Sequence, residues 1–101
     1  MWLPARMIMA IAALVVAPAM AETVDPAAIA ELAENCQICH GPMGQGAGAL
    51  QAIGGRSVYD LILLLTGFRD GTLSATLMQR LMKPLSDAEI AALAAEIAQW
   101  K

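Results

Sequence analysis

The sequence predicts a small all-α domain that follows a separate N-terminal segment, and three observations support this prediction. The chain has 101 residues, which is room for one small domain and excludes a TIM barrel, a Rossmann pair or a two-domain enzyme. Apolar residues recur at helical spacing behind several helix-start signals, whereas no convincing strand is seen. Of the first 21 residues 18 are hydrophobic, against 41 of the remaining 80, so the two parts differ in composition.

Residues 1–21 have the order of a secretory signal peptide. Arg6 supplies the positive start, residues 7–17 are uncharged, and Ala19-Met20-Ala21 forms a small-x-small cleavage site. The apolar run is shorter than the roughly 20 residues that span a bilayer, and a proline interrupts it, which argues against an uncleaved membrane anchor. We therefore expect cleavage after Ala21 and a mature protein, residues 22–101, that is exported and has no membrane span.

The first helix of the mature chain is expected to begin at Asp25-Pro26, an N-cap residue followed by a first-turn proline, and to run into Cys39. Its apolar positions recur at helical spacing: Ile29, Leu32, Ala33 and Cys36. Gly41 to Gly55 then contain six glycines and a proline without sustained periodicity, which predicts a loop of about 15 residues. In a small domain such a loop usually encloses something or forms part of a site.

A second helix is expected from a Ser57 cap through Leu65, with a short buried strand over residues 60–66 as the alternative. Residues 67–71, with a glycine at each end, are predicted to form a turn.

Two more helices complete the predicted domain. Ser74 is expected to cap a short helix that runs through Met82 and is ended by Pro84. Ser86-Asp87-Ala88-Glu89 is a capping box that starts the last helix. The apolar stripe of that helix is Ile90, Leu93, Ala94 and Ile97.

The charge of the mature chain argues against a nucleic-acid partner. Residues 22–101 contain nine acidic and five basic residues, a net charge of −4, and the basic residues form no patch. A domain of this size also buries too little surface to be comfortably stable, so a disulfide, a metal or a large bound cofactor is expected.

Cys36-Gln37-Ile38-Cys39-His40 is the segment that carries chemistry, because two cysteines and a histidine in this order match the attachment site of a c-type haem. Near a helix end, thiols three residues apart lie on one face, where each can form a thioether with one haem vinyl group. His40 would then be held beneath the iron. We therefore expect one covalent haem c bound through Cys36 and Cys39.

Three other interpretations fit the motif less well. A thioredoxin-like dithiol belongs near a βαβ pattern, which is missing here. A zinc site needs more ligands, and the mature chain has no third cysteine and no second histidine. A structural disulfide would leave the histidine and the glycine-rich loop without a role.

A sixth iron ligand would have to be a methionine, or the iron would keep an open face, and this choice separates electron transfer from gas binding or sensing. Met43 is too near His40 in sequence to reach the opposite face easily. Met78 and Met82 come some forty residues later and lie four apart on one predicted helix, so both can face the haem and only one can bind.

The chain resembles class I c-type cytochromes, and most closely the small cytochrome subunit of flavocytochrome c sulfide dehydrogenases. The resemblance covers about Ala33 to Ile97. It is carried by four segments: Cys36-Gln37-Ile38-Cys39-His40-Gly41, Gly67-Phe68-Arg69-Asp70-Gly71, Thr76-Leu77-Met78-Gln79-Arg80-Leu81 and Leu85-Ser86-Asp87-Ala88-Glu89-Ile90.

The resemblance implies a class I cytochrome c fold, with three to four helices wrapped around one haem, and periplasmic electron transfer without catalysis of its own. It implies His40 and Met78 as axial ligands, with Met82 in reserve. A flavoprotein sulfide dehydrogenase is the favoured donor, and a free-standing carrier that delivers electrons to an oxidase is the alternative. The expected apolar cover of the haem is Leu61, Leu64, Leu65 and Phe68.

Two features depart from the family. Residues 48–53 lack the proline whose carbonyl usually accepts the second N–H of the proximal histidine, so another backbone carbonyl is expected to do so. Glu96 stands where the last helix often carries an aromatic residue, so contact with the first helix is expected to be weaker or to use Trp100. Arg56 and Tyr59 are candidate partners of the haem propionates, although an ordinary surface role is the more common one for such residues.

Overall fold

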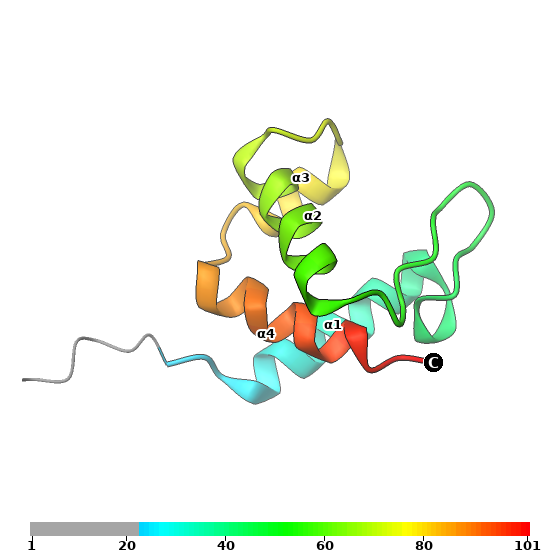
Figure 1. Ribbon diagram of the computed structural model, residues 1–101, viewed down its shortest axis with the longest axis horizontal. Coiled ribbons are helices and arrows are strands. Elements are labelled where there is room, and N and C mark those ends of the chain that lie inside the picture. The colour runs from blue at the N-terminus through cyan, green and yellow to red at the C-terminus, as the bar shows by residue number, and fades with distance from the viewer. Residues whose placement is uncertain (1–22) are drawn as a thin grey trace, which may run out of the picture.

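The computed structural model describes residues 23–101, and the predicted signal peptide and its cleavage site lie outside them. The regular elements of the described chain are all helices (Figure 1): α1 (Pro26–His40), a 3-10 turn η1 (Pro42–Gly44), α2 (Val58–Asp70), α3 (Leu77–Met82) and α4 (Asp87–Ala98). The all-α prediction is confirmed. Within residues 23–101 the only β-type pairing is an isolated bridge between Ala47 and Leu50, so the strand considered for residues 60–66 is wrong.

α1 begins where the sequence predicts and ends at His40, one residue beyond the predicted Cys39. The Asp25 carboxylate accepts a hydrogen bond from the Ala27 backbone N–H at 3.0 Å, and Pro26 fills the first position. The helix ends at His40 because Gly41 adopts φ +85° and ψ 165°, a conformation that L side chains rarely adopt. The segment Cys36–His40 therefore forms the C-terminal end of α1.

α2 is longer than predicted, and the turn expected at residues 67–71 is wrong except at its last residue. The Ser57 hydroxyl caps the helix by accepting from the Asp60 N–H at 3.1 Å. Gly67 lies inside the helix, where a Cβ would come within 2.8 Å of the Leu73 side chain. Gly67 thus permits the close return of the chain after α2, and Gly71, at φ +82°, ends the helix.

The N-terminus of α4 is capped by side-chain hydrogen bonds, whereas that of α3 is not. Ser74 does not cap α3: the residue before the helix is Thr76, whose side chain makes no capping hydrogen bond, so that prediction is wrong. The capping box of α4 is confirmed, with the Ser86 hydroxyl accepting from the Glu89 N–H at 3.1 Å and Glu89 accepting from the Ser86 N–H at 3.0 Å.

The core is centred on α4, which packs against α1 and α2, while α2 also packs against α3 (Figure 1). The predicted stripe of α4 is buried in full, and it meets buried residues of the other helices: Ile29, Ala33, Leu61, Leu65 and Met82. Arg69 joins the end of α2 to the start of α4 through a 2.7 Å ion pair with Asp87. The carboxylates of Asp70 and Asp87 raise the pKa of Arg69, so this side chain keeps its charge.

Candidate functional site

His40 is oriented by the loop that follows α1. Its Nδ1 lies 2.9 Å from the backbone carbonyl oxygen of Gln51. Because a carbonyl oxygen only accepts hydrogen bonds, Nδ1 carries the proton of this hydrogen bond, and in the neutral imidazole the lone pair is then on Nε2. The expectation that a carbonyl other than a proline's would hold the imidazole is confirmed, and the structure identifies that carbonyl as Gln51.

The loop is drawn back onto the end of α1 by its own backbone. The Gly46 N–H donates to the His40 carbonyl at 2.6 Å, and a Cβ on Gly41 would lie 2.7 Å from the Gly46 carbonyl oxygen. Ala47 and Leu50 bond each other in both directions, at 3.2 and 3.0 Å. These backbone hydrogen bonds fold the loop back so that Gln51 lies beside His40, and the Gln51 carbonyl orients the imidazole.

Cys36 and Cys39 form no disulfide with each other and lie in different surroundings. Cys36 is partly buried, and Cys39 is exposed. Burial raises the pKa of the Cys36 thiol, and the neighbouring Cys39 adds to the rise. The two thiols flank the cavity described next.

A cavity of about 340 Å³ lies between the last turn of α1 and α3. α1 contributes Cys36, Cys39 and His40, and α3 contributes Met78 and Met82. Most of the remaining wall is apolar: Leu32, Ile38, Leu50, Leu77 and Leu81. The structure therefore brings all five predicted haem-binding residues to one apolar cavity.

A second cavity, of about 270 Å³, shares part of this wall, because Cys36, His40, Leu50 and Met78 line both cavities. The predicted apolar cover lines the second cavity in full: Leu61, Leu64, Leu65 and Phe68. The glycine-rich loop and α2, which follow each other in the chain, thus both contribute to the wall of this cavity.

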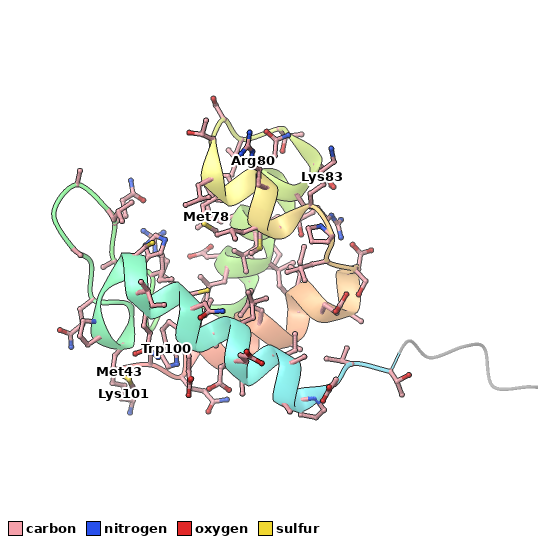
Figure 2. All side chains as sticks on the ribbon, turned by 180° about the vertical axis from the view of Figure 1, so that it is seen from behind. Met43, Met78, Arg80, Lys83, Trp100 and Lys101 are labelled. Atoms are coloured by element: carbon pink, nitrogen blue, oxygen red, sulfur yellow. The ribbon has the colours of Figure 1, made fainter. Side chains whose placement is uncertain are left out.

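The three methionines of residues 23–101 differ in position. Met78 is partly exposed and borders both cavities, whereas Met82 borders only the first and is otherwise fully buried in the core. Met43 lines neither cavity. Figure 2 shows it well apart from Met78, at the end of the molecule that also holds Trp100 and Lys101. The geometry therefore singles out Met78 as the methionine that shares the most space with His40.

Arg56 and Tyr59 have different surroundings. Arg56 lines the second cavity, and its Nε donates to the Ala52 carbonyl at 3.1 Å. Tyr59 is 71% exposed and lines neither cavity. Of these two residues, only Arg56 lines a cavity, namely the second one.

The sequence offered Trp100 as a contact of the first helix, and its position against the glycine-rich loop was not predicted. It follows the end of α4, is 5% exposed and packs on the glycines of the loop, where a Cβ on Gly44 would lie 2.9 Å from its ring. Glycines at positions 44, 54 and 55 indicate that another part of the chain approaches the loop backbone closely. The sequence does not show that this part is Trp100, which lies more than forty residues later.

Other uses of the motif find less support. In residues 23–101 no three His, Cys, Asp or Glu side chains gather in a way that would hold a metal ion, as a zinc site requires. The same residues contain no βαβ unit of the kind that carries a thioredoxin-like dithiol.

None of the helices in the described part of the chain has the length and apolar character needed to cross a membrane. The chain matches no known protein-family profile, and a comparison with curated proteins found no relative. The assignment of function therefore rests on the residues that meet at the two cavities.

Proposed function

We propose that the protein transfers electrons in the periplasm through a single c-type haem, bound by Cys36 and Cys39 and ligated by His40 and Met78. The observation that carries the proposal is the combination of the Cys-x-x-Cys-His motif with a hydrogen bond of 2.9 Å from His40 to Gln51, at a cavity that Met78 also lines. When bound, the haem would supply an iron that cycles between the ferrous and ferric states.

The cysteines would attach the haem without losing any atoms. Each S–H adds across one vinyl group, so that a carbon–sulfur and a carbon–hydrogen bond form while the carbon–carbon double bond becomes single. Cys36 and Cys39 lie on consecutive turns of α1 and both line the first cavity, which is the arrangement that two such bonds require.

His40 would bind through Nε2, because Nδ1–H is committed to the Gln51 carbonyl. Such a hydrogen bond orients the imidazole and increases its basicity as a ligand. The last turn of α1 and the folded-back loop hold the ring from two sides, so His40 is prepared for ligation by the fold itself.

Met78 would complete the coordination with a thioether, a soft and weak donor that favours the reduced iron. The apolar residues of α2 that line the second cavity act in the same direction, since they disfavour the more highly charged ferric centre. Met82 is the reserve ligand, but its full burial supports a packing role.

A redox partner would have to approach the rim of the first cavity. Ile38, Leu77 and Leu81 line this cavity and are exposed, so they present an apolar rim to solvent. Residues 71–86 contain Arg80 and Lys83 but no acidic residue, in a chain that is acidic as a whole. The favoured partner is a flavoprotein sulfide dehydrogenase, either as a permanent complex or as the donor to a free carrier.

The deciding experiment is the absorption spectrum of the protein purified from the periplasm of a host that attaches c-type haem. We expect a covalent haem and a six-coordinate low-spin spectrum that changes slowly or not at all under carbon monoxide. A five-coordinate protein that binds carbon monoxide rapidly would contradict electron transfer and favour a sensor. Co-purification of a flavoprotein from the native source would identify the donor.

A further inference from the structure

We propose that Trp100 is a positioning residue for His40: it holds the loop that carries the Gln51 carbonyl and thereby sets the strength of the hydrogen bond to His40 Nδ1. The inference rests on the proposed role of His40 as an iron ligand. Trp100 lines neither cavity, so it acts on the site only through the loop.

Trp100 is fixed to the end of α4. Its backbone N–H donates to the Ile97 carbonyl at 3.1 Å, and the same carbonyl accepts from the Gly55 N–H at 3.2 Å. One carbonyl thus joins the last turn of α4, the tryptophan and the end of the glycine-rich loop. With 5% of its surface exposed, the side chain is held against the loop and is not free to swing into solvent.

The ring rests on glycine backbone. A Cβ on Gly44 would lie 2.9 Å from Cε3 of the indole, and a Cβ on Gly54 would lie 3.2 Å from Cβ of Trp100. Both distances are so short that a residue with a side chain at position 44 or 54 would force Trp100 or the loop to move. The two glycines therefore allow an approach in which Trp100 contacts the loop backbone itself.

The contact lies at the base of the segment that contains Gln51. The Gly44 carbonyl accepts from the Ile53 N–H at 2.8 Å and from the Gly54 N–H at 3.0 Å, which closes the loop at its base. Gln51 comes two residues before Ile53. A shift of Gly44 or Gly54 away from Trp100 would open this base and move the Gln51 carbonyl away from the imidazole.

The test compares holo-proteins carrying Trp100→Ala and Trp100→Phe with one carrying Ile90→Val. Ile90 is fully buried in the same core but lies about ten residues earlier on α4, roughly 15 Å along the helix axis, so it reports general destabilisation. Two quantities are measured: exchange of the His40 Nδ1 proton in the ferrous protein by NMR, and the reduction potential.

We expect the Nδ1 proton to exchange about tenfold faster in Trp100→Ala, the size that corresponds to the net contribution of one hydrogen bond. The reduction potential should rise, because a more weakly hydrogen-bonded imidazole donates less to ferric iron. Trp100→Phe should shift both quantities in the same direction by less. Ile90→Val should lower the unfolding midpoint and change neither.

If Trp100→Phe lowers the unfolding midpoint but leaves both the exchange rate and the potential unchanged, the residue is only structural and the proposal is overturned. Trp100→Phe decides the matter even where Trp100→Ala does not fold. A wild-type protein that carries no covalent haem would instead overturn the proposed function, which separates the two failures.

Discussion

Met78 and Met82 lie four residues apart on α3, yet only Met78 borders both of the cavities that His40 lines. Met82 is 0% exposed and packs in the core with the buried residues of α4. Helical spacing places both methionines toward the same side, but the depth of each in the core distinguishes them. This difference leads to the first prediction.

Met78→Ala should abolish the near-infrared sulfur-to-iron charge-transfer band of the oxidised protein, and Met82→Ala should retain it. Met82→Ala should instead cost about 2–5 kcal/mol of unfolding free energy, as expected for truncation of a buried core side chain. Near-infrared absorption and denaturant titration check the two effects. Loss of the band in Met82→Ala alone would show that Met82 and not Met78 is the axial ligand. The proposal that the protein binds a c-type haem would still hold.

Gly41→Ala should destabilise the holo-protein by about 3 kcal/mol, the upper end of the cost of a strained backbone residue, because the new Cβ also meets the Gly46 carbonyl. Gly48→Ala is the matched control, since Gly48 also has a positive φ, of +59°, but nothing lies within 4 Å of its Cβ position. It should cost about 1 kcal/mol. Equal losses in guanidinium titrations would show that the close approach of residues 41 and 46 is unimportant.

Ser86→Ala should cost about 1 kcal/mol, because it removes the hydroxyl that accepts from the Glu89 N–H in the capping box. Ser74→Ala should change stability by less than about 0.5 kcal/mol, because Ser74 is exposed and caps no helix. Thermal unfolding of the two variants measures the difference. A larger loss for Ser74→Ala would mean that α3 does depend on a hydroxyl cap.

The two thiols should differ in reactivity in the haem-free chain, made in the cytoplasm and checked for helix content by circular dichroism. Cys39 is exposed, whereas burial raises the pKa of Cys36, so Cys36 stays protonated to higher pH and forms less thiolate near pH 7. Iodoacetamide should therefore modify Cys39 first, and the reaction at Cys36 should catch up only as the pH rises.

The exported protein provides the control for this experiment. Neither thiol should react there, because both sulfurs would be thioethers. Modification of both cysteines in the exported protein, measured by mass spectrometry of the tryptic peptides, would argue against haem attachment.

Arg80→Glu together with Lys83→Glu should slow electron exchange with an acidic redox partner at low salt, and the difference from wild type should shrink as ionic strength rises. Lys101→Glu is the matched control, because Lys101 lies at the other end of the molecule from Arg80 and Lys83 (Figure 2). Stopped-flow kinetics give the rates. Because Lys101→Glu changes the net charge by half as much as the double variant, an effect about half as large would show that net charge, and not the surface beside the cavity rim, controls association.

Much of the fold could be predicted from local signals. Asp25-Pro26 and the capping box at Ser86 set the starts of α1 and α4, and the four apolar positions of α4 are all buried as their spacing predicts. One error was the Ser74 cap, since Ser74 caps no helix, and another occurred at a residue that has two uses. Gly67 was interpreted as part of a turn, but it lies in a helix and makes room for Leu73.

The sequence by itself determined the helical class, the placement of Cys36, Cys39 and His40 at the end of one helix, and the residue type, methionine, that would complete the coordination of the proposed haem. These features depend on spacing along one segment, which local geometry governs. Only the tertiary structure decided that Met78 and not Met82 shares both cavities with His40, that Gln51 supplies the acceptor, and that Trp100 packs on Gly44. These relationships join residues distant in sequence, and the packing of α3 and of the chain after α4 sets them.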